Sequence, residues 1–277
     1  MRKANLMLHC GSSRVTRDQM REVKTPLGTD THKPIPHTLL WDKTLSAFED
    51  EGYELVNEAH ALNVRDEQDP EVFNHYFGLM QLAPKGHDGA AWSSDQEYAL
   101  IAGVRNAHDK RFPAAIAAGA NLFVCDNLAF HGEVHVSRRH TKNIFDDLDG
   151  VIDNAVTMFN NHRDRIPRRH EAYQEALIPS QRHAHDIVVR AWREHGAIPK
   201  TAADHVLDEY DNPSHEDHTV FDMRGRRSLW RLYNAFTEAL KGRGRTNRLG
   251  TLAERTMNLH GLLDAEAETL GGFCYAD

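Results

Sequence analysis

The sequence contains few cysteines, and those present do not form a recognisable pattern. Cys10, Cys125 and Cys274 are far apart and lack a CxxC spacing. This excludes a disulfide framework and a zinc ribbon, and it predicts reduced thiols. Cys125 lies in an apolar run beside Asp126 and Asn127, where a reactive thiolate is not expected.

Long apolar runs are also absent. No segment approaches the roughly 18 to 20 apolar residues that a membrane helix needs, and the apolar run in Met1–Gly11 is too short for a signal peptide. We therefore expect a soluble, cytoplasmic protein with no membrane partner.

The motifs of several enzyme classes are missing as well. There is no GxSxG elbow, no HExxH and no carboxylate–lysine set of the PD-(D/E)xK type. Gly242–Thr246 is rich in glycine but follows a predicted helix and lacks the GxxxxGK[ST] pattern, which excludes an ATP-binding loop. The sequence favours a protein without catalytic chemistry, and no cofactor is expected.

What is present is typical of one compact globular unit. The 277 residues are 40% hydrophobic and 27% charged, enough for a full core. Apolar steps of three and four predict a helix from His37 that closes at Gly52. Strands are predicted at Tyr53–Val64, His75–Leu82 and Glu97–Arg105, and together they suggest an antiparallel meander.

The rest of the chain is predicted to hold a short helix, two more strands and then helices. Pro113–Ala120 reads as the short helix, while Asn121–Cys125 and Glu133–Ser137 read as strands with a turn at His131–Gly132. Beyond Asn143, apolar stripes at helical spacing indicate helices throughout, and the polar stretch Asp211–Arg227 is the expected boundary.

The predicted fold class is therefore α+β, an antiparallel β-meander with covering helices and a helical C-terminal half. We divide the chain into an extended N-terminal arm at 1–36, containing a short helix near Arg17–Val23, an α+β core at 37–142 and a helical half at 143–277.

Several segments resemble a known family. They are NLMLHCG at 5–11, GVRNAHDKRFP at 103–113, FVCDNLAF at 123–130, GEVHVSRRHT at 132–141 and the segment Leu229–Lys241. The chain resembles, over most of its length, the phage- and plasmid-borne family filed as domain of unknown function nine-three-two. This resemblance implies a mobile-element protein but supplies no catalytic residue. The order of elements is also similar in outline to single-strand annealing proteins of the Rad-fifty-two kind, a fold-level analogy.

Charge is unevenly distributed along the chain. The net charge is −8, which argues against a nucleic-acid partner on average, but basic residues cluster in short segments. Arg138, Arg139 and Lys142 lie where a strand passes into a helix, a position that favours a bound phosphate. The alternative is that Asp146, Asp147 and Asp149 neutralise these cations.

Two further basic segments extend this pattern. Arg105, Lys110 and Arg111 follow the clearest strand, where the alternative is a solvated turn capped by Asp109. Arg243 and Arg245 lie beside a helix that carries Trp230, Tyr233 and Phe236, an aromatic stripe more typical of a core.

The 19 histidines raise the possibility of a metal site. A metal-dependent nuclease or hydrolase would use clustered His and Asp side chains, for which the candidates are His60, His108, Asp109, His131, His135 and His140. Their spacing matches no metal template, so structural or surface roles are favoured.

The leading hypothesis is a mobile-element protein that binds single-stranded DNA and possesses no catalytic activity. It would bind through Arg105, Lys110, Arg111, Arg138, Arg139, Lys142, Arg243 and Arg245. The alternatives are the metal-dependent hydrolase and an interaction protein that binds a host factor. A homo-oligomer is expected, because a short meander leaves strand edges unpaired.

Overall fold

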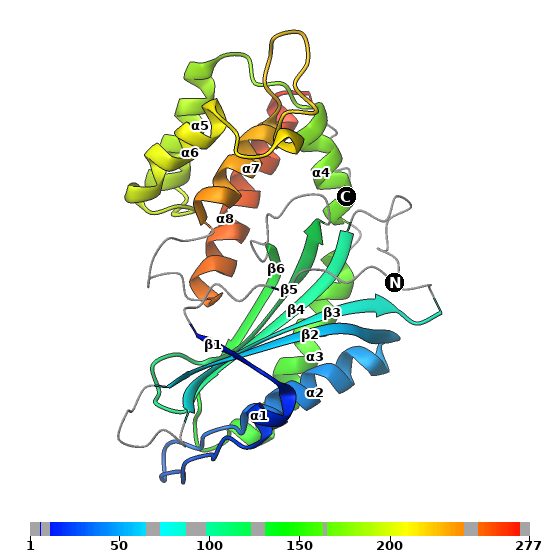
Figure 1. Ribbon diagram of the computed structural model, residues 1–277, viewed down its shortest axis with the longest axis vertical. Helices are drawn as coiled ribbons and strands as arrows, with labels where there is room; N and C mark the ends of the chain where they lie inside the picture. Colours follow the sequence, from blue (N-terminus) through cyan, green and yellow to red (C-terminus); the bar gives the residue numbers. More distant parts are fainter. Residues whose placement is uncertain are drawn as a thin grey trace.

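The computed structural model describes Leu6 and residues 12–64, 73–86, 98–122, 131–162, 165–240 and 249–271. These residues form a six-stranded sheet with helices on one face and a helical unit at one end (Figure 1). The α+β fold class predicted from the sequence is confirmed.

The sheet is a fully antiparallel meander in which each strand pairs with the next along the chain. Its strands are β1 (Ser13–Val15), β2 (Tyr53–Val64), β3 (Phe73–Pro84), β4 (Tyr98–Ala107), β5 (Ala114–Leu122) and β6 (His131–Arg138). The predicted strands at β2, β3 and β4 are confirmed. The sequence reading missed β1, whose three residues are too few to show an alternating pattern.

One face of the sheet is covered by α2 (His37–Asp50) and α3 (Ile144–His162). Alternate side chains such as Tyr76, Met80 and Val104 point to these helices and form one buried cluster with them. Gly78 belongs to this face because a Cβ atom there would lie 2.9 Å from the Trp41 ring. The predicted helix end is confirmed: Gly52, with φ +85°, turns the chain from α2 into β2.

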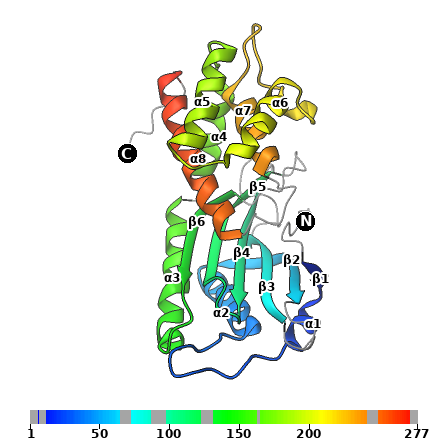
Figure 2. The same ribbon diagram turned by 90° about the vertical axis from the view of Figure 1, so that its left-hand side faces the viewer.

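The later helices build a second buried cluster. They are α4 (Arg165–Glu175), α5 (Gln181–Arg193), the 3₁₀ turn η1 (Lys200–Ala202), α6 (Ala203–Asp211), the 3₁₀ turn η2 (Glu216–His218), α7 (Leu229–Leu240) and α8 (Leu249–Thr269). Figure 2 shows α8 descending from this unit onto β6. The aromatic stripe of α7 is buried here, which confirms the core interpretation over a nucleic-acid surface.

Packing divides the chain differently from the strand-to-helix change at residue 142. Side chains of α3 lie in the sheet cluster, so the helical unit begins with α4. The polar stretch 211–227 connects α6 to α7 inside one cluster, and Arg227 pairs with Asp211 across it. The chain therefore does not divide there, because both flanking helices bury their apolar faces together.

Two local predictions are wrong. The predicted helix at Pro113–Ala120 is β5, and the predicted turn at His131–Gly132 lies within β6. Alanine favours a helix in isolation, but β4 and β6 flank this segment and supply strand partners on both sides. The end of the β portion near Arg139 is confirmed. Residues 123–125 of the predicted strand lie outside the described residues.

The N-terminal arm also contains α1 (Arg17–Arg21), which confirms the predicted short helix. From there residues 22–36, named the strap below, run in extended form past the end of the sheet where α3 begins (Figure 2). Among the described residues, no helix is both long and apolar enough to cross a membrane.

Candidate nucleic-acid interface

Strand register brings two of the predicted basic segments to one end of the sheet. Arg105 near the end of β4 faces Ala115 of β5, and Ala114 faces Arg138 at the end of β6. The β4–β5 turn and the β6–α3 connection are therefore neighbours. The strap runs beside them. The strap, the β4–β5 turn and the β6–α3 connection are together named the basic end below.

His32 of the strap joins all three parts. Its Nδ1 lies 2.9 Å from the carbonyl oxygen of His140, and its Nε2 lies 3.3 Å from that of His108. Both partners are carbonyl oxygens, which can only accept hydrogen bonds. The ring also stacks on that of His140, with centroids 5.4 Å apart.

A second anchor lies beside the first. The carbonyl oxygen of Ile35 accepts hydrogen bonds from Asn106 Nδ2 at 2.7 Å and from His108 Nε2 at 2.9 Å. The His37 ring lies flat on the His108 ring, with centroids 4.0 Å apart. These contacts fix the strap against β4 and bury five polar residues at this end of the sheet, His32, His37, Asn106, His108 and His140.

Burial favours the neutral form of two of these histidines. Desolvation, with His32 and His108 nearby, lowers the pKa of His140 to about 4. Desolvation also lowers the pKa of His108, opposed in part by its hydrogen bond to Ile35. Among the described residues, neither ring nitrogen of His140 has a hydrogen-bond partner, and the ring stacks on that of His32 instead.

Four exposed cations surround this buried cluster: Lys33, Lys110, Arg139 and Lys142. Each lies within two residues of a histidine of the cluster. Among the residues that the structure describes, none of the four has a carboxylate within ion-pair distance. Lys110 also has a φ of +64°, a left-handed conformation rare for a side chain of its size.

Two predicted site residues of this region are partly neutralised. Arg138 donates to Asp147 at 2.5 and 3.2 Å, and Arg111 lies 3.5 Å from Asp109. Both arginines remain half exposed. Asp149, expected as a partner of the same cations, instead pairs with Lys43 of α2.

Arg105 does not belong to the exposed set. Its side chain is only 8% exposed and lies over the Phe112 ring, 5.1 Å from the centroid. The helix-covered face takes the even-numbered residues of β4, so Arg105 points to the opposite face. Arg243 and Arg245 lie outside the described residues.

The candidate metal ligands do not gather in one place. His108 is directed to Ile35 in the strap, whereas the Asp109 carboxylate accepts a hydrogen bond from His75 at 2.9 Å. His60 is bound to the Tyr76 hydroxyl. The side chains of His131 and His135 lie outside those described, and the described residues contain no group of three or more potential ligands arranged to hold a metal ion.

A pocket of about 780 Å³ opens between the strap and the start of α3. Pro26 and Lys33 line it from the strap, and Lys142 and Phe145 line it from the other side. The sequence reading missed Lys33 and Phe145. Lys33 belongs to the segment that the sequence predicts as an extended arm, and no local pattern indicates that this arm crosses the sheet end. Phe145 lies one residue off the buried stripe of α3, which was the available signal.

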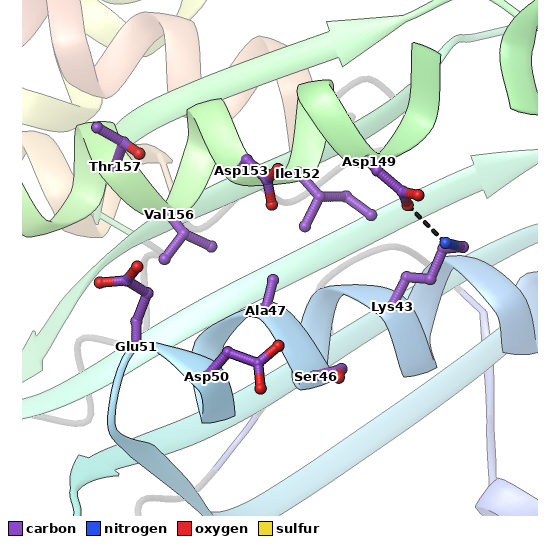
Figure 3. Close-up of a pocket in the computed structure, with 10 residues that line it drawn as sticks. All are labelled: Lys43, Ser46, Ala47, Asp50, Glu51, Asp149, Ile152, Asp153, Val156 and Thr157. Carbon is purple, nitrogen blue, oxygen red and sulfur yellow. Dashed lines mark hydrogen bonds and ion pairs between the residues drawn. The ribbon is translucent and has the colours of Figure 1, made fainter. Parts of the chain in front are cut away.

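A second, smaller pocket of about 300 Å³ lies in the groove between α2 and α3 (Figure 3). Its charged residues are mostly acidic and comprise Lys43, Asp50, Glu51, Asp149 and Asp153. Lys43 is held by Asp149 at 2.5 Å. The carboxylates of this acidic groove oppose the approach of a phosphate.

Comparison of the chain with protein-family models, with curated proteins and with solved structures finds no match. The resemblance to a phage- and plasmid-borne family therefore stays a prediction. The fold and site define an α+β protein with a basic, strap-covered sheet end.

Proposed function

We propose that the protein binds single-stranded nucleic acid at the basic end, without catalytic chemistry. The observation that carries this proposal is the meeting of Lys33, Lys110, Arg139 and Lys142, four exposed cations without described carboxylate partners. They come from three separate segments of a chain with a net charge of −8. Unpaired cations repel one another unless an anion lies between them.

Single strands suit this surface better than a duplex. A duplex is read by a helix or a two-stranded ribbon that enters its groove, whereas the cations of the basic end lie on the strap, the β4–β5 turn and the β6–α3 connection. Exposed cations on such segments can follow a flexible phosphate backbone. The proposal retains Lys110, Arg111, Arg138, Arg139 and Lys142 from the sequence prediction and adds Lys33. It omits Arg105, and it leaves out Arg243 and Arg245 because they lie outside the described residues. A cytoplasmic location, a mobile-element origin and a homo-oligomeric state stay predictions.

The test compares two triple variants that each remove three positive charges. Lys110, Arg139 and Lys142 are replaced by Ala in one. Arg165, Arg168 and Arg182, exposed on α4 and α5, are replaced by Ala in the other. Affinity for a fluorescent oligonucleotide is measured at several salt concentrations. The first variant should bind at least about tenfold more weakly, and its slope of log K against log[salt] should fall by about 2, roughly 0.7 for each lost phosphate contact.

The control variant should retain most of the wild-type affinity and salt slope. Equal losses in both variants would mean that overall charge governs binding, and the basic end would then have no special role. Undetectable binding by the wild-type protein at low salt would contradict the proposed function itself.

A further inference from the structure

Phe145 is exposed where the other apolar residues of α3 are not. Ile144, Leu148 and Ile152 of the same helix are buried in the sheet cluster, whereas Phe145 is 43% exposed. It is the one aromatic residue among the large exposed hydrophobic side chains of the described chain. The ring lies outside the buried sheet cluster, so packing in that core does not explain the residue.

The pocket beside Phe145 combines the groups that recognise a nucleotide. Lys33 and Lys142 can contact phosphates, and the aromatic ring offers a face on which a base stacks. Asp30 and Asp146 also line the pocket. These carboxylates repel phosphate but accept hydrogen bonds from the amino groups of bases, which favours the base inside and the backbone at the lysines.

The walls of this pocket are held in place before any ligand binds. In the strap, the backbones of Thr29 and His32 bond to each other at 2.7 and 3.3 Å, and His32 is in turn anchored to His108 and His140. On the other wall, Asn143 accepts hydrogen bonds from the backbones of Asp146 and Asp147. A preformed site loses less entropy on binding than a mobile one.

We propose that the Phe145 pocket accepts one base of the bound strand, stacked on the Phe145 ring, with adjoining phosphates at Lys33 and Lys142. This inference rests on the proposed function and extends it. A surface of cations alone binds any polyanion, whereas the Phe145 pocket makes the protein prefer a strand that carries bases.

The experiment measures affinity for two oligomers of equal length and charge, an oligodeoxynucleotide and its abasic counterpart. The wild-type protein should prefer the strand with bases, and 2-aminopurine in that strand should change fluorescence on binding. Phe145→Ala should weaken binding of the base-containing strand roughly tenfold and leave binding of the abasic strand unchanged. Phe145→Trp should retain the preference, and Phe145→Leu, which keeps apolar bulk without a ring, should lose it.

Met257→Ala is the matched control, since Met257 is 40% exposed on α8 and distant in sequence from the pocket. It should behave as the wild type does. Equal wild-type affinity for both oligomers, or an unchanged Phe145→Ala variant, would overturn the stacking inference while leaving the proposed function intact. Failure of the wild-type protein to bind either oligomer would instead overturn both.

Discussion

The basic end and the acidic groove lie along the same helix and differ in how their charges are paired. At the start of α3, Lys142 and Arg139 have no described carboxylate partner, whereas further along the helix Asp149 holds Lys43. Cations at the start of a helix are also opposed by its dipole. The net charge of −8 therefore says little about local surfaces: one region presents cations without described carboxylate partners, and in the other the lysine is paired with a carboxylate.

The two regions also differ in what lies beneath them. The basic end rests on buried imidazoles, whereas apolar residues such as Val156 and Ile152 lie under the groove. Imidazoles respond to pH near neutrality and aliphatic side chains do not. Acid should therefore weaken the basic end, which contains His108 and His140, more than it weakens the groove.

The largest expected effect is this acid sensitivity. The unfolded chain binds a proton at His140 near pH 6.5, but the folded protein does so only near its lowered pKa of about 4. His140 therefore contributes stability that is present above pH 6.5 and is lost as the pH falls toward 4. Between pH 7 and 4.5 the loss should be about 2 to 3 kcal/mol.

Urea unfolding at pH 7 and at pH 4.5 measures this loss of stability. The loss of stability in acid should be smaller in His140→Leu than in the wild type, by about the 2 to 3 kcal/mol attributed to His140. The control is His195→Ala, which changes an exposed histidine and should behave as the wild type does. If the stability of His140→Leu depends on pH as that of the wild type does, the folded protein does not lower the pKa of His140 as expected. His108 and His60, whose pKa values are also lowered by burial, should add to the wild-type loss with the same sign.

The next effect sharpens the comparison between the regions. Asp147→Asn releases Arg138 at the basic end, and the matched variant Asp149→Asn releases Lys43 in the acidic groove. The first should strengthen oligonucleotide binding several-fold and raise the salt slope by about 0.7, since one more phosphate contact forms. The second should change affinity less than twofold. If both variants gain equally, the long-range field decides binding and the contrast between the regions is lost.

The smallest effect concerns the ion pair of the groove. Lys43 and Asp149 are 38% and 64% exposed, so solvent screens their attraction. Lys43→Ala should lower the free energy of unfolding by about 0.2 to 1 kcal/mol, and 0.5 M salt should reduce this difference. Oligonucleotide affinity should stay unchanged, whereas Lys142→Ala should weaken it. Weaker binding by Lys43→Ala would place the groove within the binding surface.

The sequence predicted the strands and helices whose patterns repeat over several residues. Period-two alternation identified β4, and steps of three and four identified α2, α3 and α7. The prediction failed at β5, where alanine-rich sequence carries almost no pattern and the neighbouring strands decide the conformation. For the candidate site, the sequence identified the exposed cations around residues 110 and 139, because charge clusters are visible locally. It also included Arg105, because the packing of the Arg105 side chain over Phe112 cannot be seen in the local sequence.

By itself, then, the sequence determined the α+β class, the helical C-terminal half and the short basic segments, since each depends on neighbouring residues. Only the tertiary structure decided which of those segments meet. The register of β4, β5 and β6 sets two of them side by side. The contact of His32 with His108, which is 76 residues later in the chain, brings Lys33 to the same place. Contacts over such separations arise from strand pairing and buried hydrogen bonds, which no local pattern records.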